Sequence, residues 1–498
     1  MKKMTKAMKK TFSIFILAVA CFAAYAQEPM RTAYFLDAYN FRHQMNPAFA
    51  SARSYFALPA LGYTSVGVQS NLGVKTFLYP SANGQLATFM DNSVSRDTFL
   101  GQLHRNNIIA ADVSTSLLSI GAWGKRNGFT TVELNLKSNV SVNLPRDLFA
   151  FMKNPGADQH YDISHMGARA KAYLEFSLGH SQRINERISV GAKLKFLMGA
   201  ANARADINSM TVDMTAQEWR VNANGSLYAS CGALMNIPTY AEAGEVPEGK
   251  QPDMLDFGSI TFDAERAFRE RGISAFLGGY GAAIDLGASW EIIKGLTVSA
   301  AVLDLGFICW NNATYAETDN TPWTFTGFEE FSFDEESDNS IGNQFGHVFD
   351  GMEDLIAFQK KDSRGYTEML AATVNAGVQY KMPFWDSMSV GALLTSRIQG
   401  EHSWTEGRLS VNFAFGNVFA LSGSYAYSNF GSTFGAAMNL HCRAISFYLG
   451  TDTIPTHFTA PLVENGPVKI GLPLNKMNIG LNFGLVFNVS KRKDKLYR

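Results

Sequence analysis

The stretch Ile184–Ala200, with the sequence INERISVGAKLKFLMGA, alternates apolar and polar residues along most of its length. In an extended chain, successive side chains point to opposite faces. One face would carry Ser189, Gly191, Lys193 and Lys195, and the other would carry Ile188, Val190, Ala192, Leu194, Phe196 and Met198. The stretch therefore predicts a β-strand with one charged face and one apolar face.

The residues just before this stretch predict its partner strand in a hairpin. In residues 168–178 apolar side chains alternate with Arg169, Lys171 and Glu175, and a polar turn follows at residues 183–186. Partners in a hairpin share a face of the sheet, so the charges of the two strands are neighbours. We expect five charged side chains on one face: Arg169, Lys171, Glu175, Lys193 and Lys195.

Similar alternation recurs along the chain, at residues 132–144, 282–290, 296–302, 370–381, 388–394, 409–415, 434–440 and 477–488. Several of these runs reach the roughly 9–11 residues that a tilted strand needs to cross a membrane. Strands of soluble proteins are usually about 5–6 residues long. A sheet crosses lipid only as a closed barrel, which has no unpaired edge. We therefore predict an all-β fold, a transmembrane antiparallel β-barrel, with the charged face toward a polar lumen.

The composition fits one large barrel. The 498 residues include 43 Lys+Arg and 44 Asp+Glu, and this near-neutral balance argues against a nucleic-acid-binding protein. Aromatic residues make up 12% of the chain and charged residues 17%, which favours β-structure with an apolar exterior. No linker-like segment divides the chain, so we expect the barrel to span residues 54–490.

The first residues have the features of an export signal. Lysines precede a short apolar run at residues 11–22, and Ala24-Tyr25-Ala26 supplies small residues for cleavage. Residues 1–26 therefore predict a signal peptide, and the cell outer membrane is the expected location. Lipid attachment at Cys21 is a weaker alternative, because Ala18 stands where the lipid-attachment motif has Leu. Residues 491–498 form a basic tail, either a solvated periplasmic end or a contact for anionic headgroups or a partner.

Motifs for catalysis or for a cofactor are missing. The sequence contains no GxSxG, no HExxH and no phosphate-binding glycine loop, so an enzyme is not expected and no cofactor is predicted. An acidic stretch at residues 327–338 could suit calcium, but the spacing of an EF-hand loop is absent. We therefore expect no metal site. The stretch predicts an outer loop that carries the carboxylates Glu329, Glu330, Asp334, Glu335, Glu336 and Asp338. Its phenylalanines would form a lid or contact a partner.

Several motifs resemble one family of membrane proteins. RHQMNPAFA at residues 42–50, LPALG at 58–62 and VGVQSN at 66–71 resemble an uncharacterised Bacteroidetes family of outer-membrane β-barrels. The resemblance continues at residues 191–195, 304–308 and 448–452, and so covers nearly the whole mature chain. Asn46-Pro47-Ala48 also resembles an element of FadL-like transporters of hydrophobic compounds and of PorV-like barrels.

The resemblance implies about 14 strands and an N-terminal hatch inside the lumen, formed by residues 27–53. In such a hatch, Asn46 would satisfy backbone groups of a tight turn, Pro47 would fix the backbone dihedral φ, and Ala48 would complete the motif. A periplasmic extension that ends in a turn is the alternative reading of the same residues.

Two functions fit the sequence. The first is a channel for hydrophobic or amphiphilic small molecules. The second is a barrel without transport activity that anchors secretion or surface-protein machinery. The charged face would either attract anionic or amphiphilic cargo or form a paired network that supports the barrel. An apolar cavity in the lumen would favour transport, whereas a filled lumen with a broad outer platform would favour the anchor. Outer-membrane lipid is a partner in both cases.

Overall fold

The computed structural model describes residues 29–489 except for 60, 81–85, 125, 155–157, 159, 216–217, 232–234, 248–249, 264, 266–268, 270–271, 273–276, 319–321, 326–356, 401, 417, 443 and 456–475. The predicted signal peptide, the basic tail and the six carboxylates from Glu329 to Asp338 lie outside the described residues.

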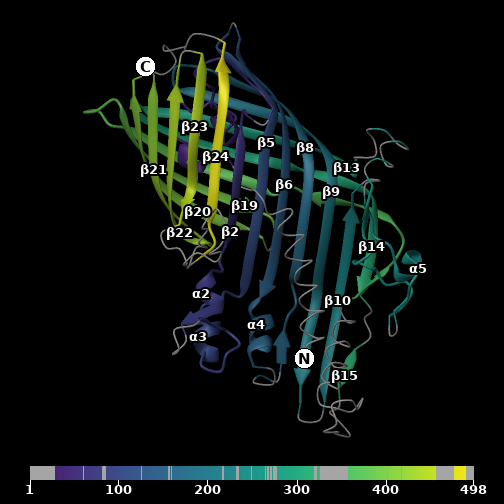
Figure 1. Ribbon diagram of the computed structural model, residues 1–498. Helices are drawn as coiled ribbons and strands as arrows, with labels where there is room; N and C mark the ends of the chain where they lie inside the picture. The colour runs from purple at the N-terminus through teal and green to yellow at the C-terminus, as the bar shows by residue number, and fades with distance from the viewer. Residues whose placement is uncertain are drawn as a thin grey trace, which may run out of the picture.

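The main sheet is a ring of antiparallel strands that pair in chain order (Figure 1). Its first strand position is shared by β1 (Tyr55–Ala57) and β2 (Thr64–Ser70), and both pair with β5 and with β24, which closes the ring. The ring continues through β5 (Asn106–Trp123), β6 (Gly128–Pro145), β8 (Met166–Arg183), β9 (Ile188–Met214), β13 (Gly279–Ile293), β14 (Leu296–Thr318), β18 (Ala372–Lys381), β19 (Met388–Ile398), β20 (Trp404–Phe415), β21 (Phe419–Ser428), β22 (Gly431–His441), β23 (Ile445–Ile454) and β24 (Ile479–Asn488).

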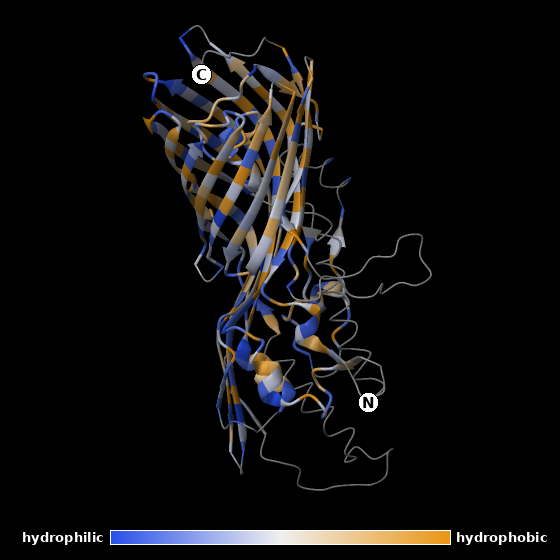
Figure 2. Ribbon diagram, turned by 90° about the vertical axis from the view of Figure 1, so that its left-hand side faces the viewer, coloured by the Kyte–Doolittle hydropathy of each residue, from blue (hydrophilic) through white to orange (hydrophobic). Residues whose placement is uncertain are grey.

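The two faces of the ring have the polarity of a membrane barrel. On β9 the side chains of Leu194 and Phe196 are 51% and 57% exposed, whereas Lys193 and Lys195 are only 2% and 5% exposed. Figure 2 shows hydrophobic and hydrophilic residues alternating along the strands. A closed sheet that turns its apolar side chains outward satisfies its backbone while it contacts lipid. The prediction of an all-β transmembrane barrel is confirmed; its number of about 14 spanning strands stays a prediction.

One side of the barrel continues far beyond the ring. Residues 202–214 of β9 pair with β10 (Trp219–Ser230), which also pairs with the end of β14. Three short helices lie at this end of the molecule (Figure 1): α2 (Val74–Phe77), α3 (Arg96–Leu100) and α4 (Arg146–Lys153). We call β10, residues 202–214 and these helices the extension.

The extension has its own hydrophobic core. Phe99 of α3 and Phe149 of α4 pack into the same buried cluster as Tyr161, Met210 and Val212. The helix α3 begins after Ser95, whose side chain accepts a hydrogen bond from the Thr98 amide at 3.2 Å. Burial of aromatic side chains on the sheet therefore gives these short helices the stability that their length alone does not provide.

Other short elements join these parts: η1 (Arg31–Ala33), η2 (Arg42–Gln44), β3 (Leu78–Pro80), β4 (Leu86–Thr88), β7 (His160–Asp162), β11 (Met235–Asn236), α5 (Tyr240–Ala243), β12 (Thr261–Phe262), β15 (Trp323–Phe325), β16 (Phe358–Lys360) and β17 (Arg364–Met369). Among the described residues, no helix has both the length and the hydropathy to cross a membrane.

Candidate functional site

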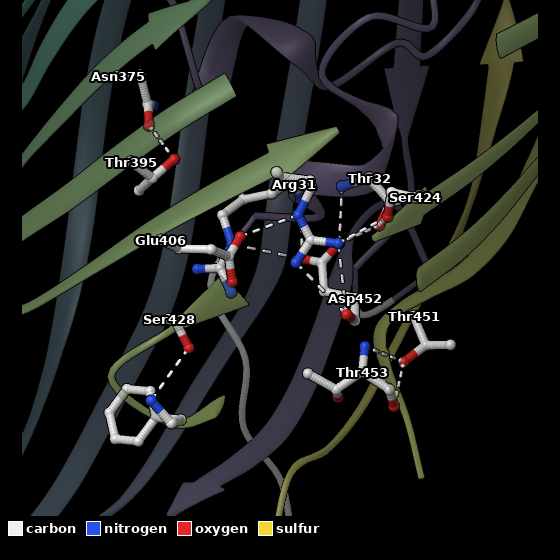
Figure 3. A network of polar contacts seen from close by, with 12 residues as sticks. Arg31, Thr32, Asn375, Thr395, Glu406, Ser424, Ser428, Thr451, Asp452 and Thr453 are labelled. Carbon is white, nitrogen blue, oxygen red and sulfur yellow. Dashed lines mark hydrogen bonds and ion pairs between the residues drawn. The ribbon is translucent and has the colours of Figure 1, made fainter. Parts of the chain in front are cut away.

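Residues 29–54, which we call the N-terminal segment, contact the inner face of the ring. Figure 3 shows where the segment begins. The Nε of Arg31 lies 3.1 Å from Glu406 on β20 and 3.8 Å from Asp452 on β23. The backbone amide and the hydroxyl of Thr32 both donate to Asp452, at 2.7 and 2.6 Å. Arg408 also pairs with Glu406, at 2.9 Å. Two buried cations therefore face two buried carboxylates and hold the segment against the wall.

The Asn-Pro-Ala motif contacts the opposite wall. The Ala48 amide donates to the Asn46 side chain at 2.9 Å, which forms the tight turn. The side-chain amide of Asn46 in turn donates to the carbonyls of Ala288 and Ala300, both at 3.3 Å. Ser181 of β8 donates to the carbonyl of Ala48 at 2.9 Å. Asn46 thus connects its own turn to β13 and β14, and the role of the motif as a hatch stays a prediction.

Glycines in the wall leave room for the segment. A Cβ atom at Gly287 would overlap the Asn46 side chain, and one at Gly191 would overlap the Pro47 carbonyl. Three strands beyond β13, on β19, Gly391 in the same way faces the aromatic ring of Phe35. Only glycine permits such close approach of a neighbouring chain. The inner wall therefore matches the shape of the segment on several strands of the ring.

An aromatic cluster fills one level of the lumen. The ring centroids of Tyr39 and Tyr448 lie 4.8 Å apart, and Phe41 lies 5.6 Å from Tyr55 and 5.5 Å from Tyr63. All five side chains are almost completely buried. Edge-to-face contacts at these distances add to the stability gained from burial. The segment therefore packs against the wall as a core and not only through polar contacts.

Lys193 forms the first part of a charged layer beside this cluster. Its ammonium lies 2.6 Å from Glu133 on β6, and Gln44 of the segment donates to the same carboxylate at 3.1 Å. The imidazole of His43 lies 3.7 Å from Glu133 and 2.7 Å from the Tyr55 hydroxyl. Burial lowers the pKa of His43 to about 4, although the charge of Glu133 acts in the opposite direction. His43 is therefore uncharged at neutral pH.

Lys195 lies at the centre of a larger cluster. Its ammonium is 2.7 Å from Asp285, 2.5 Å from Asp304 and 3.7 Å from Glu175. Lys137 pairs with Glu175 at 2.7 Å. Asp304 sits at a register shift of β14 with a φ of +56°, a left-handed conformation that costs a non-glycine residue free energy. In this conformation the carboxylate lies 2.5 Å from Lys195 on β9 and 3.7 Å from Lys137 on β6.

The other two predicted cations also have carboxylate partners. Lys171 lies 3.0 Å from Glu368, and Arg169 lies 3.5 Å from Asp206. The sequence analysis identified these cations and missed most of their partners: Glu133, Asp206, Asp285, Asp304 and Glu368. Period-two alternation could have identified Glu133, which lies between Val132 and Leu134, and Asp285, which interrupts an apolar strand.

A cavity of about 100 Å³ separates the N-terminal segment from the charged wall. Arg31 and Gln44 line it on the side of the segment, and Asn135, Lys137 and Asp304 are among the wall residues around it. Charged and polar side chains share the lining with Met45, Tyr173, Leu303 and Leu370, so the cavity is mixed and is not the wholly apolar one that would favour transport. Within the part of the chain that the structure describes, no group of His, Cys, Asp and Glu could hold a metal ion, and Cys231, Cys309 and Cys442 are free.

Several solved structures of transport proteins resemble the chain. The toluene transporter TbuX of Ralstonia pickettii is 9% identical, with a TM-score of 0.37 over 90% of this chain and 92% of that one. The toluene transporter TodX of Pseudomonas putida is 8% identical, with a TM-score of 0.35 over 93% and 94%. A FadL homologue of Pseudomonas aeruginosa is 11% identical, with a TM-score of 0.34 over 93% and 98%. Likenesses this low carry no argument about the function of this chain.

The closed ring and its apolar exterior place the protein in the outer membrane, where β-barrels occur. No curated protein matches the sequence significantly. The expected relations to a Bacteroidetes family and to PorV-like barrels stay predictions. The profile of the family of unknown function DUF5723 matches residues 47–452, so the chain belongs to that family.

Proposed function

We propose that this barrel is a channel for amphiphilic small molecules, closed at rest by its N-terminal segment. The observation that carries the proposal is the fit between segment and wall. Thr32 and Asn46 are anchored on opposite sides of the ring, and glycines such as Gly287 and Gly391 make room for the chain. The segment is held by hydrogen bonds, ion pairs and side-chain packing. A conformational change can break these contacts while the strands of the wall stay paired.

The charged layer limits the cargo. A wholly apolar molecule on the lumen path would separate Lys193 and Lys195 from water or from their carboxylates, which is costly for buried charges. An amphiphile places a polar group at this level and its apolar tail beside the aromatic cluster of Tyr39, Phe41 and Tyr63. We therefore favour amphiphilic over purely hydrophobic cargo.

A disulfide that locks the segment tests the proposal. The hydroxyl oxygens of Thr32 and Ser424 lie 2.9 Å apart, so Thr32→Cys with Ser424→Cys would join the segment to β21. Ser396→Cys with Thr405→Cys is the matched control, because those hydroxyls are also 2.9 Å apart but join two wall strands. Both pairs are made in a background in which the three free cysteines are serine.

Uptake of labelled dodecanoate and of labelled monododecanoyl glycerol, a charged and an uncharged amphiphile, is then measured in cells that lack their own fatty-acid transporter. We expect oxidation of the Thr32/Ser424 pair to lower uptake at least tenfold, and reduction to restore it. Oxidation of the control pair should leave uptake unchanged. Equal uptake by the oxidised and reduced Thr32/Ser424 protein would show that the segment does not need to move, and the channel proposal would be abandoned.

The extension favours a second candidate, a barrel that anchors other proteins at the cell surface. Its core, with Phe99 and Phe149 fully or almost fully buried, makes a folded platform beyond the ring. Native mass spectrometry of the protein extracted in mild detergent separates the two functions. A stoichiometric protein partner that is lost in a Phe99→Ala variant would support the anchor. A retained small amphiphile without protein partners would support the channel.

A further inference from the structure

Each charged side chain around the cavity has a partner of opposite charge. Each cation lies within 4 Å of a carboxylate, and each carboxylate lies within that distance of a cation. The cations of the lining are Arg31, Lys137, Lys171, Lys193, Lys195 and Arg397, and its carboxylates are Asp112, Glu175 and Asp304. The other partners of these cations, Glu133, Asp285, Glu368, Glu406 and Asp452, lie next to the lining residues. A charged ligand would therefore have to compete with an existing ion pair for its counterion.

Two amide oxygens of residues that line the same cavity have no hydrogen-bond donor among the described residues. The side-chain oxygens of Asn135 and Asn139 are buried and accept no hydrogen bond from any described residue. Both residues line the cavity, and Asn135 is only 3% exposed. They lie on β6, on either side of Lys137. A buried carbonyl oxygen without a donor is costly, so this position favours a molecule that brings O–H or N–H groups.

We propose that the cavity binds an uncharged polyhydroxyl group, such as the glycerol or sugar head of an amphiphile. Its hydroxyls donate to Asn135 and Asn139 and accept from Lys137, and no ion pair has to be broken. The cavity of about 100 Å³ has room for such a small head, since one water needs about 10–15 Å³ of it. The inference rests on the proposed channel function and adds the chemical class of its cargo.

Three amphiphiles with the same twelve-carbon chain test this inference. Monododecanoyl glycerol is uncharged, dodecanoate is an anion, and dodecyltrimethylammonium is a cation. Their binding to the full-length protein in lipid nanodiscs is measured with labelled compound. We expect one saturable site for monododecanoyl glycerol, with a dissociation constant at least tenfold lower than for either charged compound.

Variants of Asn135 locate the site. Asn135→Leu removes the free acceptor and should weaken binding of monododecanoyl glycerol about tenfold. Asn135→Asp keeps the shape and adds a negative charge, so it should shift the preference toward dodecyltrimethylammonium. The matched control is Asn439→Leu, because Asn439 is also buried, its amide atoms have no hydrogen-bond partner among the described residues, and it does not line the cavity.

The outcomes separate this inference from the proposed function. Tightest binding of dodecanoate or of the cation to the unaltered protein would overturn it, and so would equal effects of the Asn135→Leu and Asn439→Leu variants. If the Thr32/Ser424 disulfide blocks uptake but monododecanoyl glycerol does not bind, the channel stands and only the head-group class fails. If the glycerol compound binds at Asn135 but the disulfide leaves uptake unchanged, the channel proposal fails instead.

Discussion

The two halves of the ring are built on different scales. From β5 to β14 the strands are 15 to 27 residues long, with β9 the longest, whereas from β18 to β24 they have 10 to 12 residues. The short strands match the roughly 9–11 residues that cross a membrane. The strands from β18 to β24 therefore form only the wall of the barrel. The strands from β5 to β14 form the wall and also support the extension.

Register shifts keep one face of the long strands apolar and the other polar along their whole length. In the pairings of β9, Ala200 has no partner in β8 and Asn208 has none in β10. Each unpaired residue shifts the alternation by one position, so the apolar face continues from the exposed Phe196 to Ile207 and Met210, which are buried in the core of the extension. In the short half the pairings of β18 to β22 have no such shift, and one occurs between β22 and β23, at Phe434 to Ala436. Most strands that end with the membrane therefore keep a regular alternation without such shifts.

The buried charges differ between the halves as well, and this gives the largest expected effect. Replacing Lys195 by Met leaves Asp285 without a near cation, so we expect a loss of about 3–5 kcal/mol in the free energy of unfolding. Replacing Arg408 by Met in the short half should cost less, because Arg31 still pairs with Glu406 and Asp452. Urea unfolding in lipid vesicles measures both. Equal losses would mean that the segment does not share the charges of the short half.

The core of the extension gives the second prediction. Phe99 is fully buried and stacks on Phe89 at 4.4 Å, so Phe99→Ala should cost about 3 kcal/mol. The loss should stay local: limited proteolysis should cut the extension faster, while the ring keeps its resistance to sodium dodecyl sulfate. Phe434→Ala is the control, because that side chain is 49% exposed on the outer face. Collapse of the whole ring would show that the two regions fold as one unit.

The sequence predicts the wall better than the lumen and the extension. Strict alternation around Lys193 and Leu194 sufficed for the barrel, because one face meets lipid and the other does not. Alternation alone fails beyond Ala200, where a bulge shifts the pattern. The partners of Lys195 come from β8, β13 and β14, and a carboxylate such as Asp304 is brought near by an unusual backbone conformation that no local pattern encodes. The motif at Asn46 pointed to a turn, but its contacts with two wall strands depend on the fold.

His43 belongs to the segment that joins the halves, and its pKa predicts a pH dependence. The pKa is lowered from 6.5 to about 4, so the docked segment binds fewer protons than the free segment between these values. Docking is therefore fully stable above about pH 6.5 and weakens as the pH falls toward 4. We expect a loss of about 2 kcal/mol at pH 4.5, since each pKa unit corresponds to about 1.4 kcal/mol.

Unfolding at pH 7 and pH 4.5 checks this expectation. His43→Gln should remove most of the difference while keeping a polar side chain that can form a hydrogen bond with the Tyr55 hydroxyl, the partner of His43. A pH dependence that survives the substitution would point to other titrating groups. Such a result would also mean that the segment joins the two halves independently of His43.

The smallest effect is expected at the surface of the extension. His160 on β7 lies 2.6 Å from Asp213 on β9, and this hydrogen bond raises the pKa of His160 above 6.5. Asp213→Asn should bring the pKa back toward its ordinary value, whereas Asp213→Glu should preserve most of the shift. Histidine NMR signals of the protein in nanodiscs report both. Because the pair exists only while β7 stays on β9, Phe99→Ala should lower the same pKa if it releases the extension. An unchanged His160 in that variant, with accelerated cleavage, would mean that the helices detach from a strand pair that remains folded.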